Sequence, residues 1–146
     1  MPTLALDKTR SNCTIVYVNI VADTNIFLAV ILDEPEKDHI IQLTSETDPI
    51  APELLPYEIG NALSAMIKRK QITPDEALAA QKAASIIPVR LINVDVLSAL
   101  KLAIECNIYA YDAYFLHCAK SLSYPIITLD KRMKIIAAEL NIEVLE

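Results

Sequence analysis

The 146-residue chain is poor in several residue types, and each scarcity excludes a class of protein. One glycine is too few for a Gly-rich loop, so we expect no P-loop or Rossmann nucleotide site. Three cysteines at unrelated spacings and two isolated histidines indicate neither a disulfide framework nor a zinc site. Charged residues interrupt the N-terminus where a secretory signal would be apolar, and no uncharged run reaches membrane-spanning length. We therefore expect a cytoplasmic protein with no membrane segment.

The composition is that of a compact domain, with 53% hydrophobic and 22% charged residues. Residues 1–13 carry no hydrophobic period and are interpreted as a flexible lead-in, whereas 14–146 are long enough for one domain with a core. The formal net charge of −6 opposes simple electrostatic binding of nucleic acid. Two bound divalent ions would add four positive charges and reduce that figure to about −2.

Apolar, β-branched runs alternate with amphipathic segments along the chain. This alternation predicts an α/β fold of three layers, with helices on both faces of a mostly parallel central sheet. Ligand sites in such sheets lie beyond the carboxyl ends of the strands. The predicted strands are 14–22, 89–94, 126–129 and 142–145, and the predicted helices are 24–32, 36–45, about 53–70, 73–86, 96–107, 112–122 and 131–140, with a short extended piece at 49–52.

Four acidic residues occupy positions where such a fold disfavours charge. Asp23 ends the first buried strand, and Asp130 ends the run 125–129. Glu58 shares the apolar face of its predicted helix, and Asp112 lies in the first turn of another helix whose face continues inward. A carboxylate is rarely buried without a partner, so their joint placement indicates one shared site.

Each acid also has a purely structural explanation. Asp23, Asp112 and Asp130 could each cap the helix that follows. Glu58 lies in mid-helix in this interpretation, so no cap explains it and a salt bridge to a buried cation is its only structural alternative. Three further acids lie at helix starts or in polar loops and are interpreted as structural: Asp33, Asp75 and Asp95.

A metal ion would resolve the repulsion within such a cluster. Two carboxylates roughly 6 Å apart repel by about 3 kcal/mol at an effective dielectric of about 20. Without metal, their pKa values should rise. Carboxylate oxygens suit Mg²⁺ or Mn²⁺, and a site with one or two such ions performs phosphoryl chemistry on an attacking water.

Four segments resemble, in order and spacing, the acidic motifs of PIN domains. They are Val21-Ala-Asp23-Thr-Asn25, the stretch around Glu58 from Pro52 to Asn61, Tyr109-Ala-Tyr-Asp112-Ala, and Thr128-Leu-Asp130. The resemblance runs from about residue 15 to the C-terminus, and the chain length is most similar to VapC-type toxins. Asn107 departs from the pattern, since the family often has glycine there.

The resemblance implies a Mg²⁺- or Mn²⁺-dependent endoribonuclease that is often dimeric and is silenced by a small antitoxin protein. Asp23, Glu58 and Asp112 match the three core metal ligands, which are also the catalytic acids, and Asp130 matches a more variable fourth acid. Asn25 and Thr128 match polar positions that support the site. The dimer has further support in the sequence, from the apolar predicted helices 24–32 and 73–86.

Three rival functions remain at this stage. An aspartyl phosphatase would need a second aspartate where Asn25 stands. A receiver-type signalling domain would need an acidic pair near the first strand and has no use for Glu58. The third rival is a catalytically silent PIN-like module that only binds RNA or protein, and the complete set of four acids argues against it.

Overall fold

A computed structural model describes residues 17–146, and its centre is a four-stranded parallel sheet. The lead-in at 1–13, together with the start of the first predicted strand, lies outside the described residues. The strand order is β3-β2-β1-β4, so the first strand is central. The strands are β1 (Val18–Ala22), β2 (Thr47–Pro52), β3 (Arg90–Ile92) and β4 (Ile126–Ile127).

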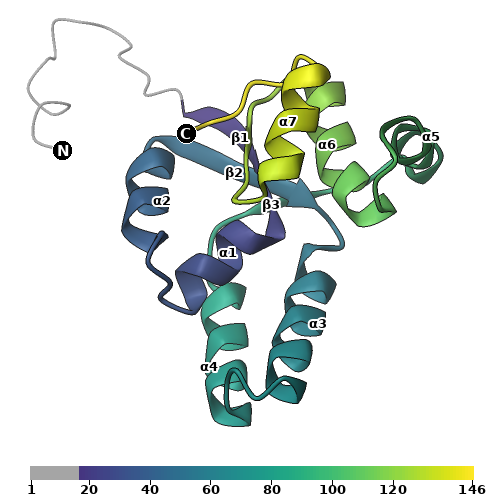
Figure 1. Cartoon of the computed structure of the whole chain (residues 1–146). Coiled ribbons are helices and arrows are strands. Elements are labelled where there is room, and N and C mark those ends of the chain that lie inside the picture. The colour runs from purple at the N-terminus through teal and green to yellow at the C-terminus, as the bar shows by residue number, and fades with distance from the viewer. Residues whose placement is uncertain (1–16) are drawn as a thin grey trace, which may run out of the picture.

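Seven helices connect and cover these strands within the described part of the chain. In Figure 1 one group lies on one side of the sheet and a second group on the other, which confirms the predicted three-layer α/β fold. The helices are α1 (Thr24–Ile31), α2 (Lys37–Thr44), α3 (Leu55–Lys68), α4 (Pro74–Ser85), α5 (Val96–Cys106), α6 (Ala110–Leu122) and α7 (Lys131–Glu139).

The core lies where β1 and β4 pass between the two helix layers. Ile20 and Val21 of β1 are fully buried, as is Ile126 of β4. Helix α6 presents Phe115 and Leu116 to the same core, and both are at most 1% exposed. Strands buried on both faces need continuous apolar runs, which is why their sequences show no alternation.

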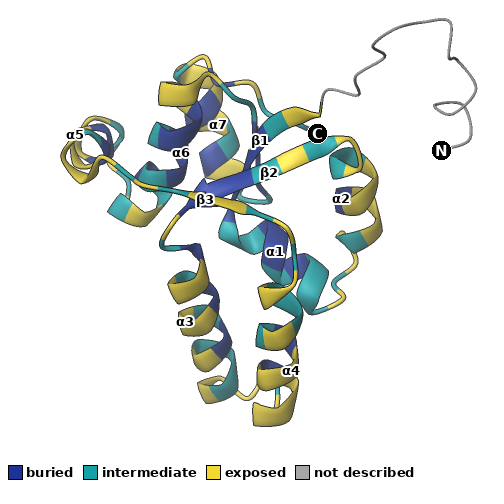
Figure 2. Ribbon diagram, turned by 180° about the vertical axis from the view of Figure 1, so that it is seen from behind, coloured by how far each residue is buried: buried dark blue, intermediate teal, exposed yellow. Residues whose placement is uncertain are grey.

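Helices α3 and α4 pack together as a pair that projects away from the sheet, whereas α5 stands at the periphery beside α6 (Figure 1). Figure 2 shows buried residues concentrated at the sheet and exposed residues along the outer faces of α3, α4 and α5. None of the helices within residues 17–146 is both long and apolar enough to cross a membrane.

Two predicted elements differ from the structure. The short extended piece at 49–52 is the end of the six-residue strand β2, which pairs with β1 and β3; Asp48 and two prolines hid its strand character. The predicted strand 142–145 is only a bridge between Ile126 and Val144. In contrast, Asn107 adopts the predicted left-handed conformation after α5, with φ 53° and ψ 52°.

Candidate functional site

The end of β1 and the end of β4 lie side by side, and this brings Asp23 next to Thr128. The Asp23 amide donates to the Ile127 carbonyl at 3.0 Å, which continues the pairing of the two strands. The Thr128 hydroxyl then donates to Asp23 Oδ2 at 2.8 Å, and the Thr24 amide donates to Asp23 Oδ1 at 2.8 Å. Asp23 is 6% exposed and Thr128 is 2% exposed, so this is a buried polar contact.

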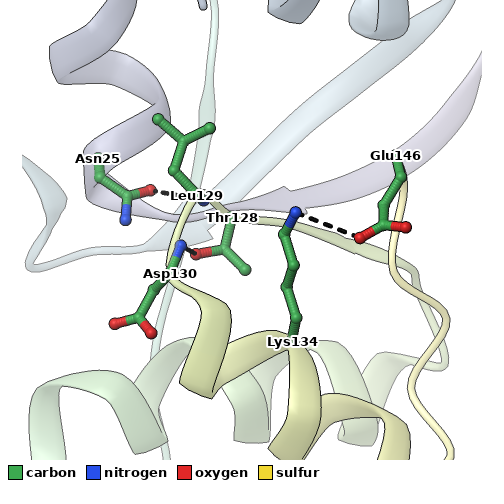
Figure 3. Close-up of polar contacts among 6 residues, drawn as sticks. All are labelled: Asn25, Thr128, Leu129, Asp130, Lys134 and Glu146. Carbon is green, nitrogen blue, oxygen red and sulfur yellow. Dashed lines mark hydrogen bonds and ion pairs between the residues drawn. The ribbon is translucent and has the colours of Figure 1, made fainter.

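The turn after β4 is held by two more polar contacts, drawn in Figure 3. The Asp130 amide donates to Thr128 Oγ1 at 3.1 Å, and the Leu129 amide donates to Asn25 Oδ1 at 3.3 Å. Thr128 thus joins Asp23 to the turn that carries Asp130, and Asn25 joins the same turn to α1. Both residues lie where a supporting role was predicted.

Glu58 lies in the first turn of α3 and not in mid-helix, so the prediction of its place was wrong. The helix begins at Leu55, after Pro52 has ended β2. A first-turn acid is favoured by the positive end of the helix dipole, and this gives Glu58 a structural contribution that the sequence interpretation denied. Its half-buried carboxylate also accepts a hydrogen bond at Oε2 from the Thr24 hydroxyl.

Asp112 lies in the first turn of α6, as predicted, but it does not cap that helix. The cap position belongs to Tyr109, which makes no side-chain capping bond. Among residues 17–146 the Asp112 carboxylate has no hydrogen-bond donor, although it is only half exposed to solvent. The Arg132 guanidinium is near enough to lower the pKa of Asp112, and it also donates to the Asn107 carbonyl at 3.0 Å.

Asp130 does cap its helix. One carboxylate oxygen, Oδ1, accepts from the amides of Arg132 at 2.8 Å and Met133 at 3.1 Å at the start of α7. In Figure 3 the carboxylate points away from the Lys134–Glu146 ion pair. The cap therefore explains Asp130 structurally, while its charge still raises the pKa of Asp112.

The electrostatics link the acids to one another. Burial raises the pKa of Asp23 to about 6; hydrogen bonds from Thr128 and Thr24 oppose the rise, and the charges of Asp112 and Glu58 add to it. Burial also raises the pKa of Glu58, where the Thr24 hydroxyl opposes and Asp112 adds. The pKa of Asp112 is raised by burial and then by Asp130. Four acids from four separate segments thus share one electrostatic environment.

Two open pockets flank this group of acids. One, of about 420 Å³, is lined by residues of α1, α3 and α6, including Thr24, Glu58 and Tyr111. The other, of about 410 Å³, includes Asp112 and Arg132. Asp23 lines neither pocket and is buried at the end of β1.

The donor set fits a hard divalent cation chemically, because its groups are carboxylates without nitrogen or sulfur ligands. However, no three Asp, Glu, His or Cys side chains in the described range stand together closely enough to hold a metal ion. Asp23 and Glu58 are instead engaged by threonine hydroxyls. An ion bound here would need water ligands or side-chain rotation. Mg²⁺ meets the first condition, since it usually keeps several waters and takes one or two carboxylates.

Sequence reasoning missed Thr24 and Arg132. The Thr24 amide donates to its neighbour Asp23, and the Thr24 hydroxyl donates to Glu58, which is 34 positions away. Its neighbour Asp23 was the only signal in the sequence, and the partner on α3 is not visible there. The three acids interpreted as structural remain so: Asp95 caps α5, Asp75 lies in the first turn of α4, and Asp33 pairs with Lys37 at 3.2 Å.

Comparison with known proteins agrees with this architecture. The chain is similar to PAE2754 from Pyrobaculum aerophilum, with a TM-score of 0.62 at 18% identity over 85% of this chain and 90% of that one. It is also similar to a crystal structure of VapBC2 from Rickettsia felis bound to a DNA fragment from their promoter, with a TM-score of 0.61 at 14% identity over 88% and 98%. Comparison with curated protein sequences gives no match. The family model of the PIN domain matches residues 20–139, and the chain therefore belongs to the PIN domain family.

Proposed function

We propose that the protein is a metal-dependent endoribonuclease that hydrolyses RNA phosphodiester bonds in the cytoplasm. The observation that carries the proposal is the coupling of Asp23, Glu58 and Asp112, each with a raised pKa, at the carboxyl edge of a PIN-domain sheet. A bound cation stabilises ionised carboxylates, and its effect is largest where the metal-free protein disfavours that ionised form. Such clustering of perturbed groups is typical of catalytic sites.

The ion would be Mg²⁺ or Mn²⁺, held by Asp23, Glu58 and Asp112, with Asp130 placing a second ion or the attacking water. When bound, such an ion supplies a more acidic water and stabilises the leaving oxygen. The chain itself contributes the negative charge that binds the ion and the hydrogen bonds that orient this charge.

The polar neighbours of the acids have separate tasks in this proposal. The Thr128 hydroxyl orients the Asp23 carboxylate by donating a hydrogen bond to it. Asn25 accepts a hydrogen bond from the turn that carries Asp130. Thr24 fixes Glu58. Arg132 stands beside Asp112 in the pocket and offers a positive group to a phosphate.

We further propose that the chain is the toxin of a type II toxin–antitoxin pair, with a small antitoxin protein and a second copy of itself as partners. The fold likeness to VapBC2 supports this assignment. A soluble mass of two chains by light scattering would support the homodimer, and a mass of one chain would contradict it. Growth arrest on expression, relieved by the product of a neighbouring small gene, would support the toxin assignment.

One observation favours a second candidate, a catalytically silent module that binds RNA or protein. The acids within the described range do not form a ready group of three metal ligands. A silent module would bind its partner equally well with and without metal.

The decisive experiment measures cleavage of a mixed cellular RNA preparation by the purified chain. We expect cleavage with Mg²⁺ or Mn²⁺, none after EDTA, and recovery when Mn²⁺ is returned. Asp112→Asn should remove cleavage while circular dichroism and the oligomeric mass stay unchanged. Full cleavage by Asp112→Asn would contradict the mechanism, and RNA binding without any cleavage would favour the silent module.

A further inference from the structure

The most exposed aromatic residues in the described range lie near two of the acids. Both phenylalanines, Phe27 and Phe115, are at most 5% exposed. Tyr109, Tyr57 and Tyr111 are instead 84%, 80% and 61% exposed. All three lie within three residues of Glu58 or Asp112 in the sequence. The three most exposed aromatic side chains thus lie beside acids of the proposed active site, whereas Tyr17, which is 46% exposed, lies just before β1.

Two of these tyrosines share the pocket beside Glu58. Tyr57 and Asn61 are four residues apart on α3, so they lie on one face of that helix. Tyr111 reaches the pocket from the first turn of α6. The pocket holds about 420 Å³, and Thr24 and Glu58 form its inner side.

The Tyr111 ring packs against a neighbouring tyrosine ring. Tyr114 meets it edge to face, with 6.0 Å between ring centroids and 84° between ring planes. Tyr114 is itself half-buried, so it limits the freedom of the more exposed ring. A ring that is already oriented loses less conformational entropy when a ligand stacks on it.

The charges around this pocket select a neutral planar ligand. Its lining contains no lysine or arginine, and its one carboxylate, that of Glu58, is a ligand of the metal ion in the proposed function, so no cationic side chain of this pocket is available to a phosphate. The neighbouring pocket contains the Arg132 guanidinium, which attracts one. A nucleobase is the uncharged part of a nucleotide, has a π-face for tyrosine, and offers edge donors and acceptors to the Asn61 amide.

We propose that Tyr57, Tyr111 and Asn61 form a subsite for one unpaired nucleobase next to the phosphodiester that is cleaved. This inference rests on the proposed ribonuclease function. A base held in a duplex has both faces stacked and its pairing edge occupied, so it cannot enter. The subsite therefore selects flexible loops or single strands of RNA, and Asn61 discriminates among bases by their edges.

The test measures binding and cleavage separately. Binding is followed by fluorescence anisotropy of a labelled 2′-O-methyl oligoadenylate of about ten nucleotides, which does not depend on cleavage. We expect Tyr57→Ala and Tyr111→Ala each to weaken binding by roughly 5- to 100-fold, whereas Tyr57→Phe keeps it. The control is Ile104→Ala, which removes an apolar side chain that is 72% exposed on α5 and leaves both pockets intact.

Two further arms identify the ligand. An oligomer with abasic positions and the same oligomer paired into a duplex should both bind the wild type weakly, and their binding should not change in Tyr57→Ala. On a cleavable RNA, Tyr57→Ala should raise KM more than it lowers kcat, because it removes ground-state binding. Asn61→Ala should reduce the preference among homopolymers more than the affinity itself.

Unchanged binding and KM in both alanine variants would overturn the subsite while leaving the ribonuclease proposal intact. Equal affinity for intact and abasic oligomers would also overturn it. If the wild type binds the oligomer through Tyr57 but cleaves no RNA, the ribonuclease proposal fails and the base-binding pocket stands. Loss in Tyr57→Ala of self-association alone, with RNA binding unchanged, would identify the tyrosines as a protein-docking surface and contradict the proposal.

Discussion

Two strand-to-helix turns of this molecule begin with the same residue type and reach opposite results. Asp23 follows β1 and caps α1, and Asp95 follows β3 and caps α5. Both accept from a backbone amide and from a hydroxyl, Thr24 and Thr128 for Asp23 and Ser98 twice for Asp95. Yet the pKa of Asp23 is raised to about 6, whereas hydrogen bonds from Ser98 lower the pKa of Asp95.

The difference comes from location and not from the cap itself. Asp95 is at the exposed periphery, where water still solvates its charge and the cap bonds add stability. Asp23 ends the central strand β1, is buried against the end of β4, and is near two other acids, so the effect of burial on its pKa outweighs that of its hydrogen bonds. The same capping motif therefore stabilises the fold at the exposed turn before α5. At the buried turn before α1 its ionised carboxylate destabilises the folded state.

The largest difference between Asp23 and Asp95 should be the effect of their substitution on the rate of RNA cleavage. We expect Asp23→Asn to lower kcat by roughly 100-fold or more, because it removes a charge needed for the cation. Asp95→Asn should cleave RNA at the wild-type rate. The measurement is a single-turnover assay with Mn²⁺, and similar losses in both variants would show that folding, not the site, is affected.

The ionised carboxylates of Asp23 and Asp95 should have opposite effects on the free energy of unfolding as the pH rises. In EDTA, the rise of the Asp23 pKa from 3.8 to about 6 makes its ionised form cost about 3 kcal/mol in the folded state. This cost is absent below about pH 4, grows as the pH rises from about 4 to about 6, and is complete above that range. Asp23→Asn should therefore gain about 3 kcal/mol relative to wild type between pH 4 and pH 7 in urea unfolding.

Asp95 provides the matched control for that titration. Its lowered pKa stabilises the fold above the unfolded value of 3.8, and this contribution is lost as the pH falls. Asp95→Asn should thus lose stability at neutral pH and match wild type in acid. A pH dependence of the same sign in both variants would contradict the assigned role of burial.

Removal of the Thr128 hydroxyl, which donates to Asp23, should have a smaller effect than removal of the Asp23 charge. Thr128→Val keeps the side-chain shape but removes a donor to Asp23 and an acceptor for the Asp130 amide. We expect a loss of about 1–3 kcal/mol at pH 7 in EDTA, since buried groups stay unpaired, and a further rise of the Asp23 pKa. NMR titration of the carboxyl carbon would show that rise, and an unchanged pKa would remove Thr128 from the site.

Removal of the Ser98 hydroxyl, which donates to Asp95, should have the smallest effect on stability. Ser98→Ala removes the 2.8 Å bond from the Ser98 hydroxyl to Asp95 but keeps the backbone bond from its amide. We expect a smaller loss of stability in urea unfolding than for Thr128→Val, because water replaces the lost donor. A loss as large as that of Thr128→Val would mean that burial does not distinguish the two turns.

The sequence predicted the layers of this fold because strong apolar runs decide where buried strands lie. It failed at β2, where Asp48 and two prolines mask a strand whose place is set by pairing with β1 and β3. The opposite error occurs at 142–145, where a strand was predicted and the structure has only an isolated bridge at Val144. A segment with high β propensity forms few pairs when its neighbouring strand is short. Both errors concern tertiary pairing, which a single segment does not encode.

For the candidate site, the sequence identified the acids but not their arrangement. The electrostatic coupling of Asp23 with Asp112 and Glu58 agrees with the predicted clustering, while the metal ligand roles stay a prediction. The interpretation of Glu58 as a mid-helix acid was wrong, because α3 starts later than the periodicity indicated and places Glu58 in its first turn. Thr24 was missed because its hydroxyl acts across two helices.

The hydrogen bond between Thr128 and Asp23 spans 105 positions of the chain. During synthesis, Asp23 leaves the ribosome long before its partner has been added. At about 5–20 residues per second, the interval between them is roughly 5–20 s. For that time β1 has no β4 beside it, and the acids have no common edge. The hydrogen bond that holds the Asp23 carboxylate therefore cannot form until residue 128 has been added, near the end of synthesis.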